Sequence, residues 1–152
     1  HLNKINLPNI VDISKKKITK RIAVAEGIIQ FSKSTFKKIE SLKTKKGEIE
    51  SIAIIAGILG AKKTSELIPL CHNIAIENID IQIKLVKKFS SLKITSTIQC
   101  RDKTGVEMEA LTAVSIACLT IYDMCKSIDK KIIIKEIKLI KKQGGKSDFS
   151  LK

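Results

Sequence analysis

The stretch 105–126, GVEMEALTAVSIACLTIYDMCK, limits most strongly what this chain can fold into. Residues 106–126 contain neither proline nor glycine, so a continuous helix here would be about 31 Å long at ~1.5 Å per residue. Most of its positions are apolar, and such a helix is expected to be buried along its length. The fold must therefore enclose one long apolar helix.

Three carboxylates on this helix need an explanation, because a buried apolar helix is not expected to carry charged side chains. Glu107 and Glu109 lie near the N-terminal end, where the helix dipole favours negative charge and where Thr104 could act as a cap. Terminal stabilisation and a functional role both stay open for these two residues. Asp123 lies near the C-terminal end, where a carboxylate is disfavoured, and it shares a face with Lys126.

The distance between these charges predicts an oligomer. Glu107 and Asp123 are separated by sixteen positions, which is roughly 24 Å along a helix. They cannot reach one small pocket within a single subunit. If both act on one substrate, the site must join the start of this helix from one copy to its end from another, as a two-fold interface does.

The charge of the chain favours a small anionic substrate over nucleic acid. The net charge is +14 over 152 residues, but the excess is almost wholly lysine, with only Arg21 and Arg101 present, and aromatic residues make up 3%. Sequence-reading interfaces favour arginine, and single-strand binders need aromatic stacking platforms. The joint excess of lysine and isoleucine is typical of AT-rich genomes. We therefore expect no nucleic-acid partner, although a positive field would attract a polyanionic small molecule.

Neither a membrane span nor a disulfide framework is expected. No run of eighteen apolar residues is free of charge, and the polar N-terminus lacks the apolar core of a signal peptide. The cysteines are widely spaced without a CxxC motif, which predicts buried thiols in a reducing, cytoplasmic setting rather than disulfides or zinc. They are Cys71, Cys100, Cys118 and Cys125.

The remaining patterns predict a sheet with helices on one face. Strands are expected at 19–32, 74–86, 92–101 and 131–142, and further helices at 33–41 and 48–63. With the long helix, this order gives the split βαβ, or ferredoxin-like, α+β plan with an antiparallel four-stranded sheet. We expect one domain over 1–152, with an irregular segment at 1–17 and a flexible Gly/Lys segment at 143–152.

Three local features refine this expectation. Gly27 predicts a bulge or a close approach in the first strand. The second helix carries small residues at helical spacing, which favours close helix packing or a subunit contact; these are Ala53, Ala56, Gly57 and Gly60. The last strand alternates, so that one apolar face should consist of Ile133, Lys135, Ile137 and Leu139, although the other face is partly apolar too, with Ile132, Ile134 and Ile140.

The loop 62–73, KKTSELIPLCHN, contains one of only two histidines. Pro69 stiffens the turn, so that Leu70, Cys71 and His72 should be held in a fixed loop. A single histidine is more often structural than catalytic, and both roles stay open for His72. Together with Glu107, Asp123 and Lys126 it could serve acid–base chemistry if the fold brings these residues together.

The segment 141–149, KKQGGKSDF, places two glycines among lysines after the last strand. Backbone amides and ammonium groups at such a turn could hold phosphate, while a solvated tail is the alternative. The segment is not a P-loop, because Ile140 stands where the first glycine would be needed.

Four sets of motifs occur in a fixed order and cover most of the chain. They are IVDIS with TKRIAVAEG (10–14 and 19–27), KKGEIESIAIIAGILGAKKTSELIPLCHN (45–73), KTGVEMEALTAVSIACLTIYDMCKSIDK (103–130) and KKQGGKSDF (141–149). Together they resemble the cyclic pyranopterin monophosphate synthase family of molybdenum cofactor biosynthesis. Each motif is weak alone, but the set is specific.

The resemblance implies a ferredoxin-like lyase that forms hexamers built from dimers, with active sites at subunit interfaces. It implies conversion of cyclised dihydro-GTP into a pyranopterin with a cyclic phosphate, with release of pyrophosphate. The rearrangement involves no net redox change, so no redox cofactor is implied, and magnesium could assist the triphosphate. No dedicated metal site is expected.

The resemblance also assigns residues by matching positions. The catalytic group would be Asp123, Lys126 and Lys46. The segments that contact substrate would contribute Leu70, Cys71, His72, Met108 and Glu109. Glu107, Lys62 and Arg21 match pocket residues, and Lys142 and Lys146 are expected near the triphosphate.

Two positions depart from the family pattern. Lys63 stands where the family commonly has arginine, which removes a bidentate fork for phosphate while keeping the charge. Asp148 directly follows Ser147, where the family usually has a glycine. A non-catalytic ferredoxin-like module that binds nucleic acid or an assembly partner is the alternative, and its affinity should fall steeply with salt.

Overall fold

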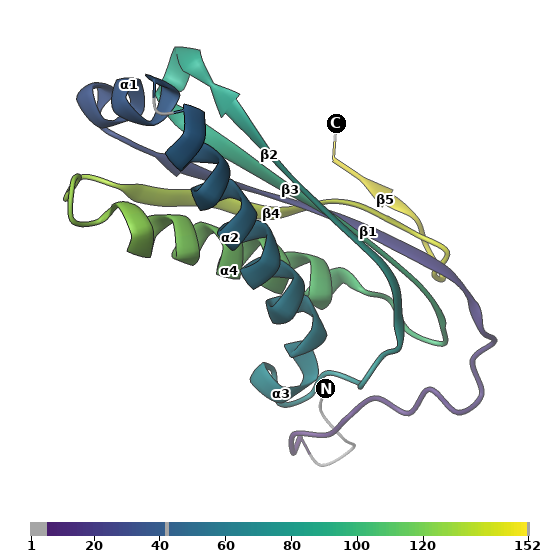
Figure 1. Cartoon of the computed structure of the whole chain (residues 1–152). Coiled ribbons are helices and arrows are strands. Elements are labelled where there is room, and N and C mark those ends of the chain that lie inside the picture. The colour runs from purple at the N-terminus through teal and green to yellow at the C-terminus, as the bar shows by residue number, and fades with distance from the viewer. Residues whose placement is uncertain (1–5, 42, 152) are drawn as a thin grey trace.

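The computed structural model describes the backbone of residues 6–41 and 43–151 and the side chains of residues 6–40 and 48–151. The chain forms a sheet with helices on one face (Figure 1). The strands are β1 (Thr19–Gln30), β2 (Ile76–Val86), β3 (Ser91–Asp102), β4 (Ile133–Gln143) and β5 (Phe149–Ser150). The helices are α1 (Lys33–Ser41), α2 (Lys43–Lys62), α3 (Thr64–Leu67) and α4 (Glu107–Cys125), and a 3-10 turn covers Lys87–Phe89. Neighbouring strands are antiparallel in the order β2-β3-β1-β4-β5.

The order of elements confirms the ferredoxin-like α+β plan, but the sheet has five strands rather than four. β5 has two residues, which is too short to show a period of two in the sequence, and it pairs with the end of β4. The Leu151 amide then donates to the Ile140 carbonyl at 2.8 Å. The C-terminal segment expected to be flexible therefore partly returns along the sheet.

Helix α2 begins five positions earlier than expected, at Lys43 rather than 48. Gly47 lies within the added turns, and glycine within a helix costs only about 1 kcal/mol relative to alanine. Tertiary packing of the following apolar turns can offset that cost. The four-residue α3 was not expected, because one helical turn leaves no readable period.

Helix α4 confirms the expected long central helix, one residue shorter at each end. Eight of its residues are buried, and Ser96 of β3 donates to the Ala110 carbonyl at 2.8 Å. Thr104 does not cap it, since the N-cap position is Val106 and no side chain caps it. By length and composition α4 could cross a membrane, but here it packs against the sheet as a core helix.

Gly27 confirms both expectations made for it. The pairing of β1 with β4 shifts between Glu26 and Ile28, which is a bulge. A β-carbon at Gly27 would come within 2.5 Å of the Val114 Cγ1 atom of α4. Glycine therefore lets the central helix approach the sheet closely.

The small residues of α2 serve helix packing. A β-carbon at Gly57 would lie 2.9 Å from the Ala113 carbonyl oxygen, and one at Gly60 would lie 2.7 Å from the Ile116 Cγ1 atom. The absence of side chains lets the α2 and α4 backbones approach each other. Gly57 and Gly60 thus contact α4 directly.

The expected apolar face of β4 is wrong in part. Glu136 has a φ of +57° at the bulge opposite Gly27, and this breaks the alternation of the strand. Ile134 and Leu139 pack against the core, whereas Ile133 is 55% exposed. An inserted residue moves every later side chain to the other face.

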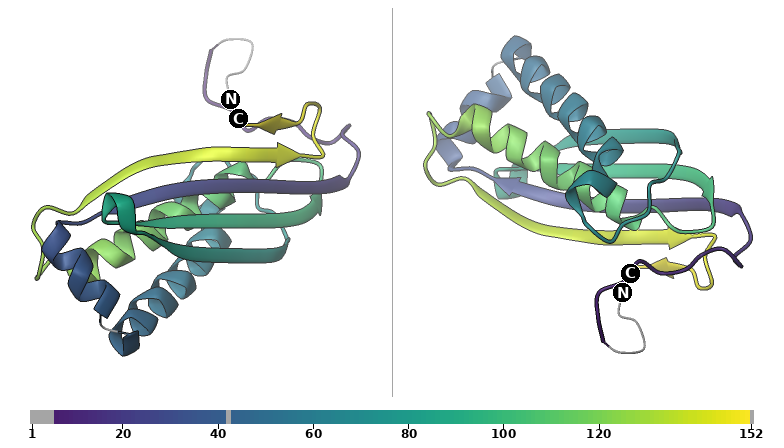
Figure 2. Two further views of the ribbon diagram at one scale, coloured as in Figure 1. Left: turned by 90° about the horizontal axis from the view of Figure 1, so that it is seen from above. Right: turned by 90° about the horizontal axis from the view of Figure 1, so that it is seen from below.

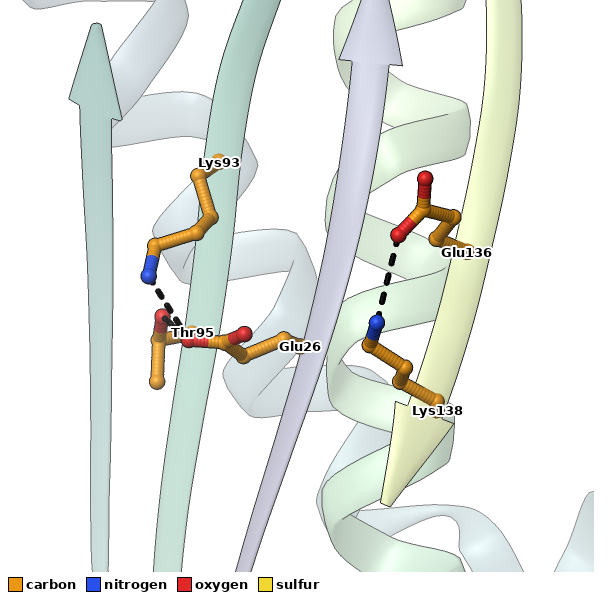
Figure 3. Close-up of polar contacts among 5 residues, drawn as sticks. All are labelled: Glu26, Lys93, Thr95, Glu136 and Lys138. Atoms are coloured by element: carbon orange, nitrogen blue, oxygen red, sulfur yellow. Dashed lines mark hydrogen bonds and ion pairs between the residues drawn. The ribbon is translucent and has the colours of Figure 1, made fainter. Parts of the chain in front are cut away.

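The helices leave one face of the sheet uncovered (Figure 2), and this face carries charged and polar side chains (Figure 3). Lys93 Nζ and Thr95 Oγ1 lie 2.8 and 3.4 Å from Glu26 Oε1, and Lys138 Nζ lies 3.2 Å from Glu136 Oε2. The Glu26 contacts join β1 to β3, whereas the Lys138–Glu136 pair lies within β4. The apolar core is thus confined to the helix side.

Candidate active site

Two adjoining cavities of about 240 Å³ each lie at the start of α4, beside the ends of β3 and β4. They share Thr104, Gly105, Glu107 and Lys142, and together they form one cleft. The first, the basic pocket, is also lined by Lys16, Arg21, Ile22, Lys103, Gln143, Gly145 and Lys146. The second, the apolar pocket, is also lined by Leu70, Cys71, His72, Ile74, Met108, Glu109 and Leu139.

Cations dominate the basic pocket. Its five basic side chains face one carboxylate, that of Glu107, whose Oε1 atom lies 3.4 Å from Lys142 Nζ. A β-carbon at Gly105 would collide with the Glu107 carboxylate, so the glycine leaves room for this side chain. Glu107 therefore orients Lys142 at the boundary of the two pockets.

Arg21 joins two walls of the basic pocket. It is only 8% exposed, and its Nε and Nη2 atoms donate to the carbonyls of Asp102 and Lys103 at 3.2 and 3.1 Å. A β-carbon at Gly145 would lie 3.0 Å from Arg21 Nη1. The guanidinium thus fixes the β3–α4 loop against the glycine turn.

The glycine turn after β4 has a defined conformation. Gly144 has a φ of +85°, and a β-carbon there would collide with the Lys20 carbonyl. The Gly144 amide donates to Asp148 Oδ1 at 3.0 Å, and the Thr19 hydroxyl donates to the Gly144 carbonyl at 2.7 Å. Asp148 therefore closes this turn in the absence of the usual glycine after Ser147.

The loop after α3 forms one wall of the apolar pocket. The Cys71 amide donates to the Ile68 carbonyl at 3.0 Å, which closes the turn around Pro69. The His72 Nε2 atom is buried and has no hydrogen-bond partner among the residues described. A buried ring nitrogen without a partner is poised to bind a polar group of a ligand.

Glu109 places a buried carboxyl group in the same pocket. It is 4% exposed, and burial raises its pKa from 4.5 to about 7, with the charges of Glu107 and Asp102 adding to the effect. Burial and the Glu109 charge also raise the pKa of the Cys71 thiol. At neutral pH Glu109 can therefore either donate or accept a proton.

Asp123 and Lys126 lie apart from this cleft, at the other end of α4. Their side chains form an ion pair of 2.7 Å and are 71% and 60% exposed. The hydrogen bond and charge of Asp123 raise the Lys126 pKa. Neither residue lines a cavity described above.

The structure brings most of the expected site residues together. The cleft contains Arg21, Leu70, Cys71, His72, Glu107, Met108, Glu109, Lys142 and Lys146. Lys62 does not reach it and lines a separate hollow between α2 and the start of β2. Lys46 belongs to α2, but its side chain lies outside the described residues.

Two lysines of the basic pocket were not expected. Lys103 begins the KTGVEMEAL motif, which was the only signal for it. Lys16 lies between the IVDIS and TKRIAVAEG motifs, outside the matching segments. Their convergence depends on how the N-terminal segment folds back, which no local pattern reports.

The cysteines of the described chain are all free; Cys100, Cys118 and Cys125 are buried as expected, whereas Cys71 is only partly buried. Burial raises the pKa of Cys118 to about 12. In the same part of the chain, no cluster of three His, Cys, Asp or Glu side chains could hold a metal ion.

Comparison with known proteins agrees with the resemblance. The MoaC family model matches residues 10–145. Proteins named cyclic pyranopterin monophosphate synthase share 50% identity with this chain in Lysinibacillus sphaericus, covering 97% of this chain and 93% of the relative. The proteins of that name from Helicobacter pylori and Campylobacter jejuni are also 50% identical, covering 100% and 97% of this chain and 97% and 94% of the relatives. The chain therefore belongs to the MoaC family.

Proposed function

We propose that this protein is a cyclic pyranopterin monophosphate synthase, a lyase that converts cyclised dihydro-GTP into cyclic pyranopterin monophosphate and pyrophosphate. The observation that carries the proposal is the two-part cleft, in which a cation-rich pocket adjoins a less polar pocket with a buried carboxyl group. Its chemistry matches a substrate with a polyphosphate at one end and a fused heterocycle at the other. The name of the relatives at about 50% identity supports the same activity.

The basic pocket would hold the triphosphate. Lysine and arginine side chains stabilise phosphate oxygens and the charge that develops as pyrophosphate leaves. Lys142 and Lys146 come from the end of β4 and the glycine turn, so both would approach the phosphates from one side. Lys142 is also held by Glu107 at the boundary where the phosphates would meet the heterocycle.

The apolar pocket would hold the heterocycle and supply proton transfers. Leu70, Met108 and Leu139 offer contact surface, while His72 and Glu109 offer polar atoms that are not exposed to water. Opening one ring and closing another requires several proton transfers. A carboxyl group with a pKa of about 7 suits such a role near neutral pH.

A second copy would complete the site with Asp123 and Lys126. In one chain this pair is exposed, and the raised pKa of Lys126 keeps its side chain protonated, so that it cannot accept a proton. Burial at a subunit interface beside a pocket would favour the neutral amine. Lys46 of α2 is proposed as the further catalytic lysine on the strength of the family resemblance.

The outer surface of the helix layer supports assembly. Its exposed apolar side chains include Ile52, Ile55 and Leu59 at helical spacing on α2 and Leu119 on α4, all between 46% and 58% exposed. Such a surface is typical of one that a partner covers. We propose a hexamer built from dimers, with each active site between two subunits.

We propose no redox cofactor, because the rearrangement involves no net redox change. Magnesium could accompany the triphosphate as a counter-ion. The four free thiols support a reducing, cytoplasmic setting.

Turnover decides the proposal directly. Purified protein should release pyrophosphate and form the pyranopterin from cyclised dihydro-GTP, and Asp123→Asn should abolish turnover while keeping fold and assembly. Absence of both products with the parent protein would contradict the proposed function. A basic binding module would instead tolerate Asp123→Asn, and its affinity for nucleic acid would fall steeply with salt.

A further inference from the structure

The segment before β1 lies against both ends of the cleft. Pro8 lines a hollow together with Leu70, Cys71 and Met108, which also line the apolar pocket. Lys16 lines the basic pocket at the opposite end. In Figure 1 this segment runs from the start of β1 back towards α3. Residues 8–16, named the N-terminal strap, therefore pass along the cleft from one pocket to the other.

Specific hydrogen bonds shape and anchor the strap. The Ser14 amide donates to Asp12 Oδ1 at 2.8 Å, and the Lys16 amide donates to the Ile13 carbonyl at 3.0 Å, which closes a turn. Lys103 Nζ donates to the Ser14 carbonyl at 3.0 Å. Because Lys103 belongs to the β3–α4 loop, this contact ties the turn to the wall of the basic pocket.

Lys16 has an unused charge. Within the described part of the chain its ammonium has no hydrogen-bond or ion-pair partner, whereas Arg21, Lys103 and Lys142 of the same pocket each have one. An unpaired cation on a shaped wall can bind an anion without first breaking an internal pair. Its neighbours Lys15 and Lys17 carry the same charge but do not line the pocket.

We propose that the N-terminal strap is a wall of the substrate cleft and that Lys16 is an additional phosphate-binding residue, with Lys103 and Asp12 as positioning residues that hold its turn. The proposal rests on the proposed function for the identity of the substrate. Its core, a polyphosphate site completed by the strap, can be tested without turnover.

Pyrophosphate is the suitable probe, because it would be a product and contains two of the linked phosphates. Binding to the assembled full-length protein is measured by calorimetry at fixed ionic strength. We expect Lys16→Ala to weaken binding about five- to tenfold, since a charge-assisted hydrogen bond is lost. The matched controls Lys15→Ala and Lys17→Ala should each change binding less than about twofold, because they alter only the general field.

Asp12→Ala separates positioning from electrostatics by the sign of its effect. Removing a negative charge near the basic pocket should tighten pyrophosphate binding if charge alone matters. If Asp12 holds the Lys16 turn, binding should instead weaken about two- to threefold. Tryptic cleavage after residues 15–17 should also become faster in Asp12→Ala and Lys103→Met, and pyrophosphate should slow it in the parent protein.

Three outcomes would overturn the proposal. They are equal losses in all three lysine variants, tighter binding in Asp12→Ala, and no measurable pyrophosphate binding by the parent protein. The pyrophosphate-binding test and the turnover test of the proposed function can fail independently. If pyrophosphate binding depends on Lys16 but the protein shows no turnover, only the enzyme assignment is refuted. If the protein shows turnover but the three lysine variants lose pyrophosphate binding equally, only the proposed role of the N-terminal strap is refuted.

Discussion

At the scale of single residues, Glu109 combines deep burial with a carboxyl group whose pKa is raised from 4.5 to about 7. The unfolded chain ionises near the lower value, so the free energy of unfolding should fall as pH rises from about 4.5 to 7, by about 3 kcal/mol. Glu109→Gln should remove most of this slope. Urea unfolding at pH 5 and pH 8 measures it.

The matched control for Glu109 is Glu66→Gln on the surface of α3. This substitution also removes one carboxylate, but its side chain is 68% exposed in an ion pair with Lys63. If both variants flatten the pH dependence equally, the buried carboxyl group is not its source.

Gly144 gives a second prediction at this scale. Its φ of +85° and the collision of a β-carbon with the Lys20 carbonyl make Gly144→Ala incompatible with the turn beside the basic pocket. We expect a loss of stability of about 1–3 kcal/mol and a higher KM, measured by urea unfolding and steady-state kinetics. Gly145→Ala should be milder, because the nearest obstacle is the end of the Arg21 side chain. Equal effects of the two variants would contradict the argument.

At the scale of elements, the local patterns predict the strands and helices well, and the exceptions have nonlocal causes. Alternation identifies β2 and β3 because a half-buried strand repeats every two residues. It fails in β4, since the bulge at Glu136 forms opposite Gly27 of another strand. The start of α2 is missed because Gly47 disfavours a helix locally, and tertiary packing of the apolar turns that follow it can offset that cost.

The α2–α4 packing gives a prediction at the element scale. Gly57→Val would place methyl groups where the Ala113 carbonyl and the Ile81 side chain already lie, so the helices must separate. We expect the free energy of unfolding to fall by about 2–4 kcal/mol, measured in urea. Ser51→Val, on an exposed position of the same helix, controls for helix propensity and should cost less than about 1 kcal/mol. Similar losses in both variants would show that close packing is not the cause.

At the scale of the whole molecule, the sequence predicts which residues matter better than where they meet. The helix rise separates Glu107 from Asp123 without any structure, and the continuous α4 confirms that they lie at opposite ends. Motif resemblance finds nine of the residues that line the cleft. It does not find the contribution of Lys16, because the strap reaches the cleft only through tertiary contacts.

The separation of the two ends of α4 leads to a prediction about mixed assemblies. Covalently linked dimers carrying Glu107→Ala on one subunit and Asp123→Ala on the other would have one site with both substitutions and one intact site if sites are shared. About half of the parent turnover per dimer should then remain, measured as pyrophosphate release. If each subunit instead worked alone, each of the two sites in the dimer would carry one substitution, and nearly all turnover would be lost. Linked dimers with Glu107→Ala on both subunits set the inactive baseline. Turnover well below half of the parent value would count against shared sites. Sharing is expected because α4 keeps its two ends about 24 Å apart in every subunit.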